Sequence, residues 1–124
     1  MGENIKFGDV IQVDFGDTIG CVQGAQRPAV VVQNDQGNRY SPTTIVIPLS
    51  KELKKLNMPV HDVLYKSKTN GLSEDSVILG EQLRVIDKST IIYKRGYLNR
   101  DEIQKVIAVY VNNLPNGGLQ YGTV

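Results

Sequence analysis

An arginine followed by a proline stands where a polar stretch meets an apolar run, in the segment QGAQRPAVVVQND. Because proline disfavours helical dihedral angles in the residue before it, Arg27 is held extended and its guanidinium projects from the mouth of the predicted strand. A guanidinium is a planar fork of donors that matches two oxygens of a phosphate. Arg27 is therefore a candidate phosphate-binding residue. The alternative is a structural ion pair with one of the carboxylates of Asp14, Asp35 and Glu81.

Ser50 directly follows the next predicted strand, residues 43–49, and closes it. If this strand pairs with the strand that begins after Arg27, one hydroxyl and one guanidinium meet at the same end of the sheet. A serine that precedes a helical stretch is also a typical N-cap, and SKELKKLN can form a short helix over residues 50–57. One hydroxyl can do both, so the two interpretations of Ser50 stay open.

Two further segments carry side chains that could read single-stranded nucleic acid. The segment NDQGNRY, which contains Asn34, groups amides with a tyrosine, and such groups contact the edges and faces of unstacked RNA bases. The same residue types are common in turns, so the segment alone favours neither interpretation. The segment ILGEQLRVID adds Glu81, Gln82 and Arg84 at the end of another predicted strand.

Other catalytic chemistries have weaker support. Histidine titrates near neutral pH, so His61 could act as a general base, but VHDVLY is typical of a strand and favours a structural role. Cys21 is the single cysteine, which excludes an internal disulfide and a cysteine-based zinc site. The chain has no P-loop, HExxH or dinucleotide-binding motif. We predict neither a metal nor a cofactor.

Short strands in regular succession must position these residues. The alternation of DVIQVDF, with Val13 and Phe15 on one face, predicts a half-buried strand over residues 9–15. The polar loop that follows, residues 16–26, is long, and long loops on a rigid sheet usually carry function. The remaining strands are predicted over residues 28–33, 43–49, 60–65 and 76–80, with a break in the chain at NDQGNRYSP.

One helix is predicted near the end of the chain. Asn99 can cap it, and Glu102 completes a capping box. Apolar residues then recur at helical spacing and predict a core-facing stripe. The stripe consists of Ile103, Val106, Ile107, Tyr110 and Leu114. Several short strands and one closing helix indicate an α+β, mostly β domain, built as a strongly bent antiparallel sheet or half-open barrel.

The size and charge of the chain set limits on its partners. A length of 124 residues fits a single domain, which we expect over residues 1–114, followed by a flexible tail over residues 115–124. The net charge of +1 does not indicate a general nucleic-acid or membrane binder, so local patches must meet any anionic partner. No apolar run is long enough for a membrane helix and MGENIKFGD lacks a signal-peptide core. We expect a cytoplasmic protein with no membrane partner.

Several segments in fixed order resemble the MazF/PemK toxins of bacterial toxin-antitoxin pairs. They are GDVIQVDF, QGAQRPAVVVQND, GNRYSPTTIVIPLS, SVILGEQLRVID and the closing helix, and the resemblance runs from Gly8 to about Leu114. It implies an SH3-like β-barrel that forms a homodimer, cuts single-stranded RNA at a short sequence without a metal, and is neutralised by a cognate MazE-like antitoxin.

The resemblance also implies roles for particular residues. It makes Arg27 and Ser50 the catalytic pair, with the ribose 2′-hydroxyl as nucleophile and with 2′,3′-cyclic phosphate and 5′-hydroxyl products. It makes the loop over residues 16–26 a gate of the RNA groove. Under the same resemblance, the base readers are Gln23, Asn34, Glu81 and Gln82.

Two alternative functions fit the same fold. A non-catalytic gyrase poison resembling CcdB would rely on a tryptophan at the end of its last helix, and this chain has no tryptophan. A plain SH3-like peptide-binding module would need an aromatic-lined groove, for which six tyrosines and two phenylalanines spread along the chain give little support.

Overall fold

The strands and helices follow one another along a short chain. The computed structural model describes residues 4–17, 25–53 and 61–115. The strands are β1 (Asp9–Asp14), β2 (Gln26–Val31), β3 (Thr43–Ser50), β4 (His61–Leu64), β5 (Ser76–Leu79), β6 (Arg84–Asp87) and β7 (Ile91–Tyr97). The helices are α1 (Asp35–Tyr40) and α2 (Arg100–Asn112), with single turns of 3-10 helix at η2 (Gly80–Gln82) and η3 (Lys88–Thr90).

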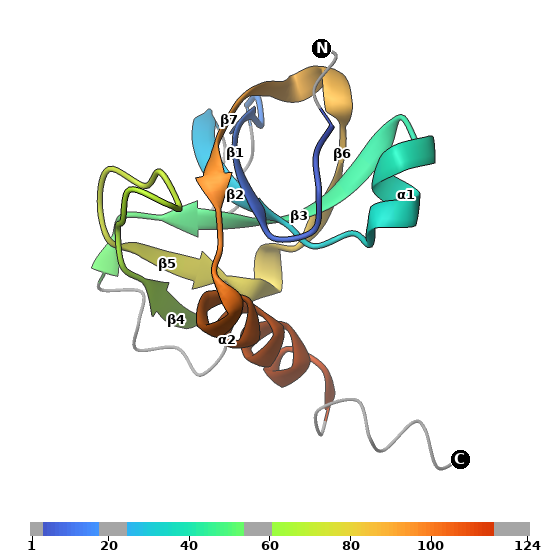
Figure 1. The fold of residues 1–124 in the computed structure, drawn as a ribbon. Coiled ribbons are helices and arrows are strands. Elements are labelled where there is room, and N and C mark those ends of the chain that lie inside the picture. The colour runs from blue at the N-terminus through green and yellow to red at the C-terminus, as the bar shows by residue number, and fades with distance from the viewer. Residues whose placement is uncertain (1–3, 18–24, 54–60, 116–124) are drawn as a thin grey trace.

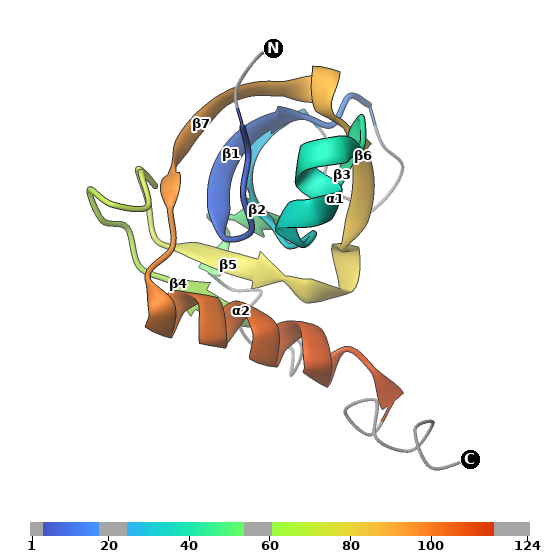
Figure 2. The ribbon, with the colours of Figure 1, turned by 45° about the vertical axis from the view of Figure 1, so that its right-hand side comes forward.

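The strands form one strongly bent antiparallel sheet. Its order is β4-β5-β3-β2-β1-β7, and β6 pairs with β3 off this path. Figures 1 and 2 show the sheet curling round on itself, with α2 beneath β4 and β5. The predicted fold class, an α+β, mostly β half-open barrel closed by a helix, is therefore confirmed.

The predicted elements are correct in part. The five predicted strands and the last helix are present, each within a few residues of the expected bounds. The predicted interruption between strands at NDQGNRYSP is present, but α1 (Asp35–Tyr40) within it was not predicted, and neither were β6 and β7. Most of the helix predicted over residues 50–57, and nearly all of the predicted tail, lies outside the described residues.

Both faces of the central strands are buried. Successive side chains of a strand point to opposite faces, and neighbours such as Val30 and Val31 enter different clusters of the core. One cluster lies between the sheet and α2 and includes Val10, Val30, Ile47, Leu49, Leu64, Ile78, Val106 and Val109. The other fills the curl of the sheet and includes Ile11, Val13, Ala29, Val31, Val46, Ile86 and Ile91. Two buried faces explain why these strands read as continuous apolar runs.

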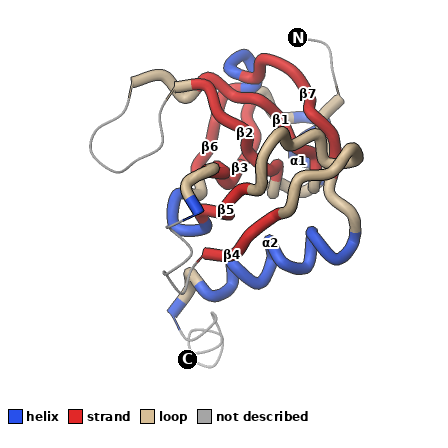
Figure 3. The backbone as a smooth tube through the Cα atoms, turned by 90° about the vertical axis from the view of Figure 1, so that its left-hand side faces the viewer, coloured by secondary structure: helices blue, strands red, loops and turns tan. Residues whose placement is uncertain are grey.

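Helix α2 begins with the predicted capping box. Asn99 Oδ1 accepts from the Glu102 N–H, and Glu102 Oε1 accepts from the Asn99 N–H, each at 2.9 Å. The predicted core-facing stripe is partly wrong. Val106 and Val109 are buried, whereas Ile107, Tyr110 and Leu114 are 45%, 41% and 37% exposed. The helix lies against β4 and η2 along a narrow face (Figure 3), so its other apolar side chains face outward. No helix among the described residues is long and apolar enough to cross a membrane.

Helix α1 forms around a buried asparagine. Its N-cap, Asn34, accepts from the Gly37 N–H at 2.9 Å. The Asn38 side chain is buried, donates to the Gln33 carbonyl at 2.9 Å, and accepts from the Thr44 hydroxyl at 2.7 Å. The Lys88 ammonium also donates to the Asn38 carbonyl. These partners lie outside the helix. The contacts that stabilise α1 therefore could not be predicted from the sequence of the segment alone.

The loop between β4 and β5 is fastened to β7 (Figure 3). Asn70 is fully buried and serves as its hub. Its side chain accepts from the Ser67 and Leu72 N–H groups and donates to the Tyr65 carbonyl and to Glu102 Oε2. The backbone approaches β7 so closely here that a Cβ on Gly71 would stand 2.1 Å from the Arg95 carbonyl oxygen. The loop can lie against β7 because residue 71 has no side chain.

Substituting this glycine separates close packing from backbone strain. Gly71 and Gly16 both have a φ of +69°, but nothing lies within 4 Å of a Cβ built on Gly16. We expect Gly16→Ala to lower the free energy of unfolding by about 1 kcal/mol, the cost of the left-handed conformation alone. Gly71→Ala should cost at least about 3 kcal/mol, because the β7 backbone must also move. Urea unfolding of both variants measures the difference, and equal losses would contradict the close approach.

Candidate functional site

The strand register brings Arg27 and Ser50 to the same place. The pairing of β2 with β3 sets Ala29 opposite Pro48. Because the strands are antiparallel, two more residues along each would set Arg27 opposite Ser50, on one face of the sheet. The pairing ends before this point, at Ala29 and Pro48. On the other edge of β3, Leu49 and Ser50 pair with Ile78 and Val77 of β5.

Ser50 is buried, with 2% of its surface exposed. Its Oγ accepts from the Glu52 N–H at 3.2 Å, which is the local capping contact that the sequence allowed. Among the described residues no acceptor takes the hydroxyl hydrogen. The hydroxyl is therefore held by one contact, and its hydrogen is not used in a hydrogen bond within the described part of the chain.

A polar pocket of about 230 Å³ opens beside this pair. Arg27 lines it, as do the neighbours of Ser50 in the chain, Leu49 and Lys51, but Ser50 itself does not. The Lys51 ammonium lies 3.7 Å from the Glu74 carboxylate in an exposed ion pair. Glu74 also lines the pocket, and the other lining residues are Gln12, Gln26, Pro28, Leu72, Ser73, Ser76 and Arg95. The pocket thus collects cationic and hydrogen-bonding side chains from β1, β2, β3, β7 and the loop before β5.

The three predicted base readers that the structure describes do not line this pocket. Asn34 follows β2 at the end opposite Arg27, where it caps α1. Glu81 and Gln82 lie in η2 and do not line the pocket. Gln23 and Cys21 lie outside the described residues. Base reading by these residues stays a prediction. Asn34, Glu81 and Gln82 do not surround Arg27 within one copy of the chain.

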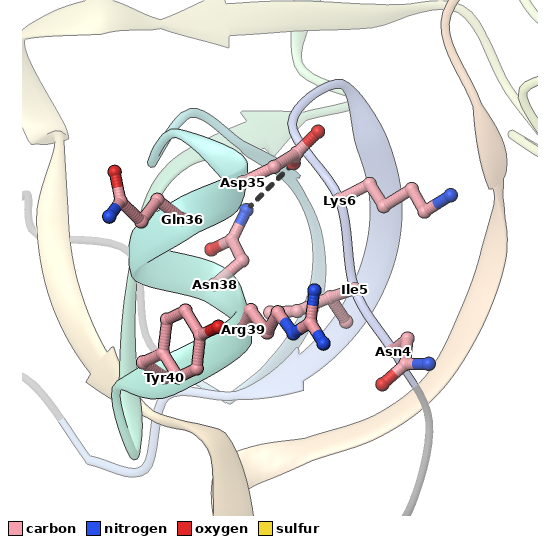
Figure 4. Close-up of a pocket in the computed structure, with 8 residues that line it drawn as sticks. All are labelled: Asn4, Ile5, Lys6, Asp35, Gln36, Asn38, Arg39 and Tyr40. Carbon is pink, nitrogen blue, oxygen red and sulfur yellow. Dashed lines mark hydrogen bonds between the residues drawn. The ribbon is translucent and has the colours of Figure 1, made fainter.

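A second, larger hollow lies at α1 and holds none of the predicted site residues. Its volume is about 760 Å³, and Figure 4 shows the side chains around it. The Arg39 guanidinium lies 5.4 Å from the centre of the Tyr40 ring. The lining residues are Asn4, Ile5, Lys6, Asp35, Gln36, Asn38, Arg39 and Tyr40. Arg27 and this hollow are at opposite ends of β2, so the two pockets are separate.

Comparison with known proteins assigns the chain to a family. The family described as "PemK-like, MazF-like toxin of type II toxin-antitoxin system" matches residues 6–109. The chain belongs to this family. It is 42% identical to endoribonuclease EndoA of Bacillus subtilis (strain 168) over 102 residues, which are 82% of this chain and 87% of that protein. The recognition of a MazF/PemK toxin from its motifs is therefore confirmed.

Solved structures of similar fold agree with this family. The crystal structure of MazF from Deinococcus radiodurans matches with a TM-score of 0.73 at 20% identity, covering 87% of this chain and 94% of that one. A mycobacterial endoribonuclease in complex with its cognate antitoxin matches with a TM-score of 0.69 at 16% identity, covering 93% and 98%. The MazF-like arrangement of the bent sheet and last helix is thus shared.

His61 is engaged within this MazF-like fold by a carboxylate. Its Nε2 lies 2.7 Å from Glu81 Oε1 and 2.9 Å from Oε2, and the imidazole is only 1% exposed. β5 lies between His61 on β4 and Ser50 on β3, so about 10 Å separates their strands. A structural role for His61 fits this geometry better than proton transfer at Ser50. The pair also gives Glu81, named as a possible partner of Arg27, a different partner.

Arg84 was named from the sequence at the end of a predicted strand, but Arg95 was missed as a member of the site region. Arg95 stands on β7, a strand that was not predicted, and it lines the pocket beside Arg27. The β-branched and aromatic residues of IIYKRGY were the signal for that strand. The Arg84 guanidinium lies 4.1 Å from the centre of the Phe15 ring, and burial lowers the pKa of Arg84. No group of three or more His, Cys, Asp or Glu residues in the described part of the chain could hold a metal ion.

The His61–Glu81 pair makes a testable contribution to stability. In Glu81→Ala the buried Nε2 loses its carboxylate, and we expect the free energy of unfolding to fall by about 1–3 kcal/mol. Glu81→Gln keeps an acceptor oxygen and should lose less. Glu74→Ala is the control, because an exposed ion pair contributes about 0–1 kcal/mol. Urea unfolding compares the three, and a loss in Glu81→Ala no larger than in Glu74→Ala would show that the contact contributes nothing.

Proposed function

We propose that the chain cuts single-stranded RNA at a short specific sequence, without a metal, at the pocket beside Arg27 and Ser50. Its family and its relative make it a toxin-antitoxin endoribonuclease of the MazF/PemK type, and the site and chemistry are the proposal. The observation that supports it most is the strand register, whose continuation by two residues would set Arg27 opposite Ser50 beside a polar pocket that Arg27 lines. We place this reaction in the cytoplasm, where RNA substrates are found.

The reaction needs little covalent participation from the protein. The 2′-hydroxyl of the ribose attacks the adjacent phosphorus, its proton passes to water, and the bond from phosphorus to the 5′-oxygen breaks. The leaving oxygen takes a proton, which gives a 2′,3′-cyclic phosphate and a 5′-hydroxyl. The protein must orient the ribose, stabilise negative charge on the phosphate and supply that proton.

Arg27 and Ser50 divide these tasks. A guanidinium stays protonated at neutral pH, so Arg27 is unsuited to be the base and suited to stabilise the charge that develops on phosphate oxygens. It can also donate a proton to the leaving oxygen. The Ser50 hydroxyl donates to the same phosphate while its oxygen still accepts from the Glu52 N–H. Water serves as the base, because His61 is held by Glu81 away from this end of β3.

Cleavage of a long single-stranded RNA in EDTA tests this function. The parent protein should cut at a defined sequence and leave cyclic phosphate ends. We expect Arg27→Ala to lower the rate about 100- to 1000-fold, as losses of oxyanion stabilisers do, and Ser50→Ala about 10- to 100-fold. Replacing the ribose at the mapped cut by deoxyribose should abolish cleavage there.

The control for these variants is Arg39→Ala, which removes an exposed arginine at the other hollow and should leave the rate unchanged. RNA that stays intact with the parent protein would contradict the function. Intact RNA together with stalled gyrase would favour a gyrase poison on the same fold instead.

An uncovered apolar surface supports the expected homodimer. A groove of about 180 Å³ between α2 and the sheet is walled almost entirely by apolar side chains. Ile107 and Tyr110 border it and are 45% and 41% exposed. The lining residues are Phe7, Val32, Ile45, Leu83, Val106, Ile107 and Tyr110. Contiguous exposed apolar surface favours association, and we propose that a second copy of the chain covers it.

A charge placed in this groove should prevent dimerisation. Ile107→Asp puts a carboxylate in the proposed interface, and Ala108→Asp puts one on the next exposed residue of α2, outside the groove. We expect Ile107→Asp to weaken the dimer at least about tenfold, because a buried unpaired charge is costly, and Ala108→Asp to leave it intact. Sedimentation velocity gives the masses, and dimers of equal strength in both variants would place the interface elsewhere.

The expected antitoxin is a disordered acidic segment that folds over the toxin. One of the matched mycobacterial structures holds a cognate antitoxin, and we propose a MazE-like partner for this chain. Disordered segments wrap a large surface at the cost of ordering themselves. The pocket with Arg27, Lys51 and Arg95 offers such a segment positive charge, so antitoxin and RNA would compete for one place.

A further inference from the structure

Arg95 is fixed at the wall of the pocket by partners on three sides. Its Nη1 donates to Gln12 Oε1 at 2.8 Å and to the Tyr93 hydroxyl at 3.2 Å. Its Nε donates to the Gly71 carbonyl at 3.1 Å, and its Nη2 donates to the Ser73 hydroxyl at 3.4 Å. A guanidinium held in this way loses little conformational freedom when a ligand binds.

The charge of Arg95 is not neutralised by these contacts. All four acceptors are uncharged oxygens, from a carbonyl, an amide, a phenol and a hydroxyl. In the described part of the chain, no carboxylate lies within ion-pairing distance of Arg95. By contrast, Lys51 at the same pocket has Glu74, and Lys94, next in the chain, has Asp9 at 3.3 Å. Arg95 therefore presents a fixed positive charge that has no counterion among the described residues.

One corner of the guanidinium is available to a ligand. A guanidinium has five N–H donors, and the four contacts leave one hydrogen of Nη2 unused. The Nη2 contact to Ser73 is also the longest, beyond the usual range for a strong hydrogen bond. Ser73 and Arg95 both line the pocket. An anion in the pocket can therefore take up Nη2 without disturbing the contacts to Gln12 and Gly71.

Gln12 connects Arg95 to the strand that carries Arg27. Gln12 lies on β1, opposite Pro28 of β2 on one side and Tyr93 of β7 on the other. β2 and β7 are thus two strand spacings apart, about 10 Å. Arg27 and Arg95 both line the one pocket from these two strands. Two guanidiniums that line one pocket from strands this far apart suit two phosphates of one extended RNA strand rather than a single phosphate.

We propose that Arg95 binds a second phosphate of the RNA, close to the scissile one, and so contributes to substrate affinity and not to bond breaking. This inference rests on the proposed function, since it assigns a further residue to the same site. The chemistry it recognises is the phosphodiester backbone, so the contact should not depend on the base.

Matched variants of Arg95 and Arg100 test the inference. Arg95→Gln removes the charge and keeps hydrogen-bonding capacity toward Gly71 and Gln12, and Arg100→Gln removes an equal charge from the exposed start of α2. We expect Arg95→Gln to raise KM roughly tenfold with kcat unchanged, and to reduce the slope of log affinity against log salt by about 0.7, the value for one contact to a single strand. Arg100→Gln should change neither. Arg95→Lys, which keeps the charge, should retain most of the salt slope.

The binding arm separates this inference from the proposed function. Affinity for the long single-stranded RNA is measured in a Ser50→Ala background, with and without Arg95→Gln, so that the RNA stays intact. If the parent protein cuts RNA but Arg95→Gln leaves KM, affinity and salt slope unchanged, Arg95 only fastens its loop and the inference fails. A fall in kcat with KM unchanged would overturn it as well. Thermal unfolding of Arg95→Gln shows whether the loop contacts survive, and Arg95→Lys carries the test if they do not.

Discussion

The divided pairing of β3 is the constraint on which the site depends. Its first half pairs with β6 along one edge, and its last residues pair with β5 along the same edge. Its other edge pairs with β2 only from Val46 to Pro48. Val32 donates to the Ile45 carbonyl, so the next backbone groups that would face each other across this ladder belong to Pro28 and Leu49. Pro28 has no N–H to extend the ladder, so the pairing of β2 with β3 ends next to Arg27.

Local chemistry explains what could be predicted from the sequence. The strand at residues 9–14 follows from alternation, α2 from its capping box, and the pairing of β2 with β3 from the simplest arrangement of consecutive strands. Each of these needs only neighbours along the chain or in the next hairpin. The predicted catalytic roles of Arg27 and Ser50 rest on that pairing and on the family.

Long-range contacts explain what could not be predicted. Helix α1 depends on Asn38, whose partners include Thr44 and Lys88. β7 pairs with β1, more than seventy residues earlier, and only that pairing brings Arg95 to the pocket. The outward-facing side of α2 also carries apolar residues. The spacing of apolar residues along the helix therefore could not distinguish the side that packs against the sheet from the side that stays exposed in this chain.

The carboxylate of Glu102 makes two hydrogen bonds that join α2 to the loop between β4 and β5. One oxygen holds the first turn of α2 through the Asn99 N–H, and the other accepts from Asn70, the hub of the loop that carries Ser73. Fraying of the helix start and loosening of the pocket wall are therefore thermodynamically linked. A contact that stabilises the start of α2 therefore also stabilises the loop at the wall of the pocket lined by Arg27 and Arg95, although other elements form most of that pocket. The order of the helix start and the order of the pocket wall are coupled through one side chain.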